Sequence, residues 1–187
     1  MFVLLSEIDN ETFYFCTLFQ ELILMIVLFQ TALSDLESGN IPNKVIITGL
    51  IFIFPFFTPE LFLKNLTEGI IVFVLFLMIW KLGFIGGGDV KLIALIALVK
   101  GADITIHIII LGLSMAAICN GVWLFLRGNL YSRFINLINY IKNYSNEAES
   151  YVDIAVRKNE GVPLAGYIFF SNLLILAYSG LSMYKRF

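Results

Sequence analysis

Two aspartates stand where a carboxylate could do chemistry. Asp35 closes a long apolar stretch, and Asp89 follows three glycines, Gly86, Gly87 and Gly88, at the start of a short one. An ionisable group within a membrane span costs at least about 2.5 kcal/mol, so it usually faces an interior cavity and often has a function. Two carboxylates that share a site cannot both ionise easily. The ionised one can take a proton from water while the protonated one polarises a peptide carbonyl, with neither acid assigned a fixed role.

The glycines before Asp89 remove every side chain from the turn that leads into the next helix. Without Cβ atoms, this backbone can approach another segment closely and can adopt φ > 0. A purely structural interpretation makes Asp89 the N-cap of a short helix over Val90–Val99. Capping alone would not require three glycines, so the run favours a functional role for the acid.

Composition places these acids in a membrane protein. Of 187 residues, 59% are hydrophobic and 14% are charged, and the mean hydropathy is +0.90. A soluble domain of this size needs more polar surface, so we expect one membrane-embedded domain over residues 1–187. The net charge of −2 argues against a nucleic-acid partner. Cys16 and Cys119 form no C-x-x-C motif, and His107 is the lone histidine, so we expect neither a metal site nor a cofactor.

The apolar segments predict an all-α protein with six transmembrane helices, two of them short. A span needs about 20 residues. Four stretches are long enough or nearly so: Phe13–Leu33, Leu66–Leu82, Ile104–Leu126 and Val162–Met183. Val45–Phe57, interrupted by Gly49 and Pro55, and Val90–Val99 are too short. They are either simply short helices or truncated helices beside a polar cavity, and short interrupted segments often mark such sites.

The loops give the expected orientation. Segments 34–44, 81–91 and 127–161 would lie on one side of the membrane and hold eight of the 12 lysines and arginines. The positive-inside rule makes that side cytoplasmic and puts Asp35 and Asp89 on it together. Within 127–161, apolar residues at helical spacing predict an amphipathic helix, either on the membrane surface or packed against the bundle.

The positions of three further residues in the apolar segments predict their structural roles. Glu21 lies inside the first span, beside Gln20, and we expect it to bond between helices. Glu68 is expected in the first turn of its helix, where a negative charge suits the helix dipole. Pro163 stands at the start of the last span. Proline is well tolerated in a first helical turn, but it could also hold extended backbone against a peptide substrate.

Two motifs at this separation resemble a known family. Gly86-x-Gly88-Asp89 is similar to the G-x-G-D signature of intramembrane aspartyl proteases. Together with Asp35 followed by Ile41-Pro42-Asn43, it resembles the type IV prepilin peptidase family, and most closely the short members that serve Flp/Tad-type pili. The start of the last span, 162–167, is also similar, and the resemblance covers about Leu33 to Leu176.

The resemblance implies a peptidase of a prokaryotic inner membrane. Such enzymes cut the leader from prepilins or pilin-like pseudopilins at the cytoplasmic face, using no cofactor. It assigns Asp35 and Asp89 as catalytic acids, and as motif residues it implies Gly86, Gly88, Pro42, Asn43 and Lys91. Long members carry a cysteine tetrad and also methylate the product. This chain lacks that tetrad, so methylation is not expected. It also lacks the arginines that short members often place before the I-P-N element.

A different class of protein remains an alternative. Paired acids at membrane depth also suit a small transporter or channel component, where they would bind a cation or a proton. Many transporters are built from repeats, and no repeat relates the regions around Asp35 and Asp89. This asymmetry favours the peptidase.

Overall fold

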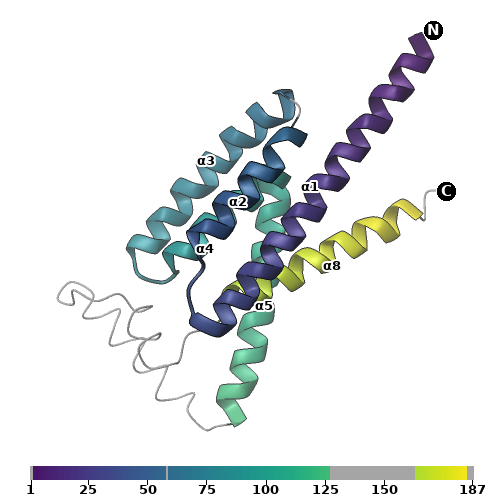
Figure 1. The fold of residues 1–187 in the computed structure, drawn as a ribbon. Coiled ribbons are helices and arrows are strands. Elements are labelled where there is room, and N and C mark those ends of the chain that lie inside the picture. The colour runs from purple at the N-terminus through teal and green to yellow at the C-terminus, as the bar shows by residue number, and fades with distance from the viewer. Residues whose placement is uncertain (1, 58, 127–162, 185–187) are drawn as a thin grey trace.

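The computed structural model describes residues 2–57, 59–126 and 163–184, and these residues are helical apart from short connections (Figure 1). The helices are α1 (Phe2–Ser38), α2 (Asn43–Ile53), the 3₁₀ helix η1 (Phe54–Phe56), α3 (Pro59–Lys81), α4 (Gly87–Lys100), α5 (Ala102–Leu126) and α8 (Leu164–Tyr184). The prediction of an all-α fold is therefore confirmed, and the described residues contain six α-helices and the 3₁₀ helix η1.

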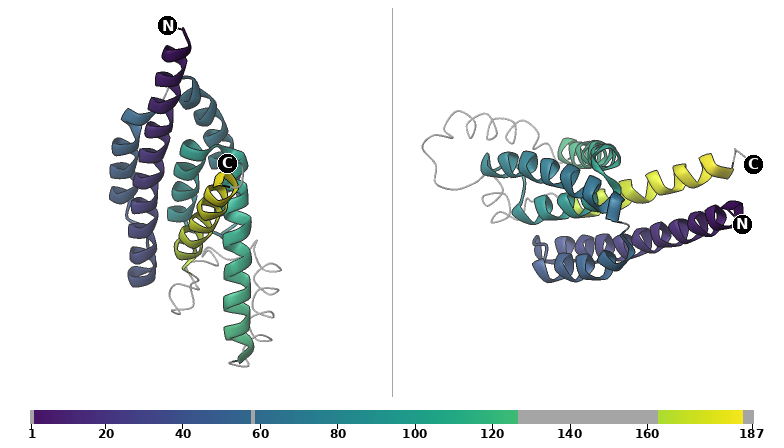
Figure 2. Two further views of the ribbon diagram at one scale, coloured as in Figure 1. Left: turned by 90° about the vertical axis from the view of Figure 1, so that its right-hand side faces the viewer. Right: turned by 90° about the horizontal axis from the view of Figure 1, so that it is seen from above.

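The described helices, taken in chain order, run in alternating directions, so the start of α1 and the end of α8 lie toward the same side of the bundle (Figure 1). Seen from above, α1 and α2 lie side by side, and α3, α4 and α5 form a second group next to them (Figure 2). Helix α8 packs against both α1 and α5. The bundle thus places the end of α1 near the start of α4, the two points that carry the aspartates.

Helix α4 occupies the centre of the bundle. It is apolar on all sides rather than along one stripe, and such a helix is stable only when it is buried. Its central side chains are fully buried against residues from α1, α5 and α8; the core includes Leu24, Leu28, Leu92, Ile93, Ile96, Ile108 and Ile168. The segment expected over Val90–Val99 is thus a 14-residue helix, about 21 Å long, which is shorter than the hydrocarbon core.

Three helices are long and apolar enough to cross a membrane within the described residues: Phe15–Ser38, Phe62–Lys81 and Ala102–Trp123. Shorter apolar helices cover Asn43–Phe56 and Leu164–Tyr178. Three of the four stretches expected to span therefore have a helix of sufficient length, whereas the fourth, Val162–Met183, has a shorter apolar helix among the residues searched. Pro55 lies within η1, where the second apolar segment leaves α-helical geometry.

Glu68 does not lie in a first helical turn, because α3 begins at Pro59, earlier than the apolar stretch suggested. Polar residues ahead of that stretch extend the helix. The amphipathic helix predicted within 127–161 falls outside the described residues and stays a prediction.

Helices α5 and α8 pack closely at a glycine. A Cβ atom on Gly112 would lie 3.2 Å from the Ser171 hydroxyl oxygen and 3.4 Å from the Tyr167 carbonyl oxygen. On the same helix, a Cβ atom on Gly121 would meet no atom within 4 Å. The position of α8 therefore depends on the missing side chain at one of these glycines and not at the other.

We expect the G112L substitution to destabilise the protein by about 1–3 kcal/mol, because the leucine overpacks the α5–α8 contact. The matched change G121L should leave stability within about 0.5 kcal/mol, as surface changes usually do. Thermal unfolding in detergent micelles measures both variants. Equal melting temperatures for the two would contradict the close packing described for Gly112.

Candidate active site

Asp35 lies in the last turns of α1, half-buried, and binds the start of another helix. Its Oδ2 atom accepts a hydrogen bond of 3.0 Å from the backbone N–H of Ala165, the second residue of α8. The first N–H groups of a helix have no partner within the helix, and the N-terminus carries partial positive charge. The carboxylate therefore caps α8 across a separation of 130 residues in the sequence.

Asp89 lies inside the first turn of α4 rather than before it. The helix begins at Gly87 with Gly86 as its N-cap, so the interpretation of Asp89 as the N-cap is wrong. The Asp89 carboxylate instead accepts a hydrogen bond from the Gly86 backbone N–H. This is the reach of a third helical residue back to the N-cap, as in a capping box. Glycines extend the helix further toward its N-terminus than the apolar pattern indicated.

The structure brings the two acids together. Helices α1 and α4 are in contact, and the Asp35 carboxyl group acts electrostatically on that of Asp89. Each carboxyl group also accepts a backbone N–H from the start of a helix, α8 for Asp35 and α4 for Asp89. Partial positive charge from two helix N-termini thus offsets negative charge at one place. Such a pair has the composition needed for acid–base catalysis on a peptide bond.

Each of the three glycines before Asp89 faces a different neighbour. A Cβ atom on Gly86 would lie 3.1 Å from the Asp89 Oδ2 atom, and one on Gly87 would lie 3.3 Å from the Trp80 indole nitrogen. A Cβ atom on Gly88 would lie only 2.9 Å from the Cβ atom of Ile41. All three positions are therefore crowded, which explains why the run contains three glycines.

The segment between α1 and α2 packs on this turn. Ile41 contacts Gly88, and Pro42 occupies the N-cap position of α2 with extended backbone. The next residue, Asn43, accepts a hydrogen bond of 2.8 Å from the Lys91 ammonium group through its Oδ1 atom. The I-P-N element and the glycine-aspartate turn are thus one contact region. This contact holds the end of α1 beside the start of α4.

Pro163 directly precedes α8 and is half-buried. It reaches the site through its neighbours, because Ala165 donates the hydrogen bond to Asp35. Its pairing with an extended substrate stays a prediction. The Ala165 N–H and Trp80 were absent from the expected site. A backbone donor leaves no trace in a sequence, whereas a tryptophan seven residues before Gly87 could have been noticed.

No group of three histidine, cysteine, aspartate or glutamate side chains that could hold a metal ion occurs across residues 2–57, 59–126 and 163–184. Metal-free chemistry remains an expectation drawn from the two acids themselves.

We expect G88A to lower the free energy of unfolding by about 1–3 kcal/mol, because the new methyl group overlaps the Ile41 Cβ atom, which cannot move without its backbone. The control is G166A, also in the first turn of a helix but with no atom within 4 Å of the added Cβ. That change should be neutral or slightly stabilising. Thermal unfolding compares the two, and a stable G88A variant would contradict the packing at Gly88.

The Lys91–Asn43 hydrogen bond should appear as coupling in a double-mutant cycle. We expect K91M and N43A to interact by about 0.5–1 kcal/mol, a modest value because both side chains are exposed. A parallel cycle that pairs N43A with K44M tests a neighbouring exposed lysine and should give no coupling. Equal coupling in both cycles would rule out a specific Lys91–Asn43 contact.

Comparison with known proteins adds one match. A sequence model of the type IV leader peptidase family matches residues 22–121, more than half of the chain and a range that includes both acids. No curated protein and no solved structure matches the chain.

Proposed function

Because the chain belongs to the type IV leader peptidase family, we propose that it is an aspartic endopeptidase in which Asp35 and Asp89 are the catalytic pair. Its substrates would be prepilins or pilin-like proteins with an N-terminal leader. The observation that carries the proposal is the electrostatic interaction of these two carboxyl groups, which belong to separate helices that contact each other.

The reaction needs one proton shared by the pair. The ionised acid takes a proton from a water molecule, and the resulting hydroxide adds to the carbonyl carbon of the scissile peptide bond. The protonated acid donates a hydrogen bond, and then its proton, to the carbonyl oxygen. When the tetrahedral intermediate collapses, the C–N bond breaks, the leaving nitrogen takes the proton held by the pair, and one hydroxyl group of the intermediate returns a proton to the pair as the new C=O bond forms. The products are a carboxylic acid and an amine, and the pair again holds one proton.

The site would lie at the cytoplasmic face of a prokaryotic inner membrane. Asp35 is near the end of α1 and Asp89 near the start of α4, so both lie at the end of the bundle that carries Lys44, Lys81 and Lys91. Lysine-rich loops favour the cytoplasmic side. The shortness of α4 supports access for water, because a helix of about 21 Å does not fill the hydrocarbon thickness.

We further propose that the product amine leaves without methylation. The two cysteines, Cys16 on α1 and Cys119 on α5, provide no tetrad of the kind found in the methylating members of the family. Cleavage would then be the complete reaction of this chain.

The test is co-expression with a prepilin that carries its leader. We expect D35N and D89N each to lower the cleavage rate by at least about 10²-fold, because an asparagine amide cannot exchange a proton with water or substrate as a carboxyl group does. The matched control is D103N. Asp103 occupies the first turn of α5 much as Asp89 occupies that of α4, but its side chain is 92% exposed. Immunoblots for the shortened pilin and for the enzyme in membranes report the outcome.

Normal processing by either aspartate variant, at wild-type abundance in the membrane, would overturn the two-acid mechanism. Mass spectrometry of the new N-terminal peptide tests methylation in the same samples. A methylated N-terminus produced in a host without another such enzyme would overturn the second proposal and leave the first intact.

A further inference from the structure

An ion pair joins α1 to α4 at the end of α4 opposite the aspartates. The Lys100 ammonium nitrogen lies 2.8 Å from the Glu21 Oε2 atom. The Lys100 side chain is 6% exposed and that of Glu21 is 33% exposed. Glu21 also lies inside the span Phe15–Ser38, where a charge is costly. The expectation that Glu21 bonds between helices is confirmed, and its partner is the last residue of α4.

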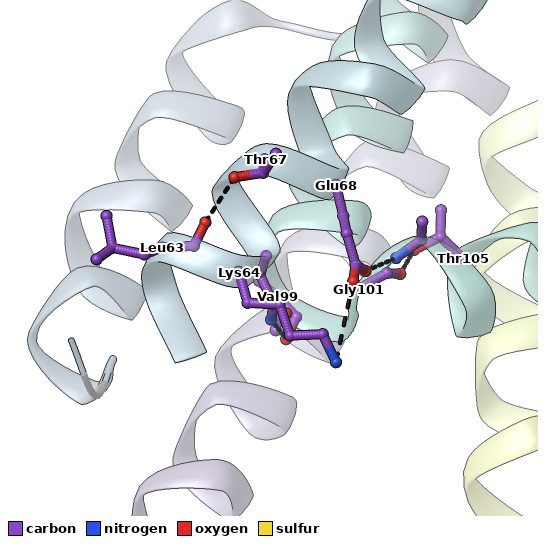
Figure 3. Close-up of polar contacts among 9 residues, drawn as sticks. Leu63, Lys64, Thr67, Glu68, Val99, Gly101 and Thr105 are labelled. Atoms are coloured by element: carbon purple, nitrogen blue, oxygen red, sulfur yellow. Dashed lines mark hydrogen bonds and ion pairs between the residues drawn. The ribbon is translucent and has the colours of Figure 1, made fainter. Parts of the chain in front are cut away.

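The backbone groups next to Lys100 have hydrogen-bond partners other than this lysine. At the turn between α4 and α5, Asn65 donates to the Val99 carbonyl oxygen at 3.2 Å, and Glu68 accepts the Ala102 N–H at 2.7 Å. Figure 3 shows Glu68 reaching from α3 toward this turn beside Gly101. Side chains of α3 therefore satisfy the turn, as irregular backbone inside a membrane requires. The Lys100 side chain instead pairs with Glu21 of α1.

Helices α1 and α4 cover similar distances between the acid pair and the ion pair. From Glu21 to Asp35 is 14 residues of α1, about 21 Å, and from Asp89 to Lys100 is 11 residues of α4, about 16 Å. The helices run in opposite directions, so the acid pair lies at one end and the ion pair at the other (Figure 1). The long lysine side chain spans the difference of roughly 5 Å.

We propose that Glu21 and Lys100 are positioning residues that hold α4 in register with α1, so that the carboxyl groups of Asp35 and Asp89 meet. This proposal rests on the proposed function. Apolar contacts have no direction and permit helices to slide or rotate. An ion pair between two helices requires its two charged groups to stay close to each other, and setting register is the best-attested use of buried polar groups.

The experiment compares four variants for kcat, KM and abundance with a synthetic prepilin peptide in detergent or nanodiscs. E21Q and K100M each remove the ion pair while keeping the length of the side chain. The double variant E21K/K100E restores it with reversed charges. The control is K64M, because Lys64 lies 3.9 Å from Glu68 at the same end of the bundle but has a side chain that is 71% exposed.

We expect E21Q and K100M to lower kcat roughly tenfold or more with little change in KM, because small displacements of catalytic groups are costly. E21K/K100E should recover part of this loss. Recovery would be incomplete, because a carboxylate at the end of α4 opposes the helix dipole. K64M should match the wild type.

A distance measurement separates positioning from stability. Spin labels on L36C, next to Asp35, and on F84C, in the connection that precedes α4, are at exposed sites and report the separation between the end of α1 and the start of α4 in a C16S/C119S background. The distance distribution should broaden or shift in E21Q and K100M and narrow again in E21K/K100E. A structural role alone would lower the melting temperature and leave the distribution and kcat of the folded enzyme unchanged.

Wild-type kcat in both E21Q and K100M would overturn the proposal, and so would a double variant that accumulates but is no better than the single variants. If none of the three accumulated in membranes, the pair would serve folding only, and the proposal would be overturned as well. These failures are distinct from failure of the proposed function, in which the wild-type protein itself would not cleave the prepilin peptide.

Discussion

The close approach of the first turn of α4 to its neighbours is the constraint on which the site depends. The Asp89 carboxyl group lies close to Gly86, the Trp80 ring to Gly87 and Ile41 to Gly88. A side chain at any of these glycines would press against that neighbour. Because this turn is bare, the segment after α1 lies directly on it. Two carboxyl groups that belong to separate helices then come within electrostatic range of each other.

Placing two acids together in an apolar bundle is costly, and the fold offsets that cost with backbone groups. Asp35 receives an N–H from the first turn of α8, and Asp89 receives one from the N-cap of its own helix. Both donors belong to helix starts, where N–H groups are free and the dipole favours negative charge. The acids and the helix starts therefore satisfy each other, and the Asp35 carboxylate links the start of α8 to the site.

Helix α4 connects this site to the rest of the protein. It is buried along most of its length, it carries an acid at one end and a cation at the other, and it contacts α1, α3, α5 and α8. A helix that is apolar on all sides has no preferred rotation from the hydrophobic effect alone. Polar contacts at its two ends fix the rotation of α4. Lys91 binds Asn43 at one end, and Lys100 pairs with Glu21 at the other.

The sequence by itself determined the membrane class of the protein and its all-α fold, and it suggested the two acids of the proposed catalytic pair, which lie within the range of the family match. These follow from composition and from local motifs, which each residue carries regardless of its neighbours in space. Only the tertiary structure decided that Asp89 lies within its helix, that Asp35 binds the start of α8, and that Glu21 pairs with Lys100. Such contacts join residues far apart in the chain, often through backbone groups that every residue has, so a single sequence contains no pattern that reveals them.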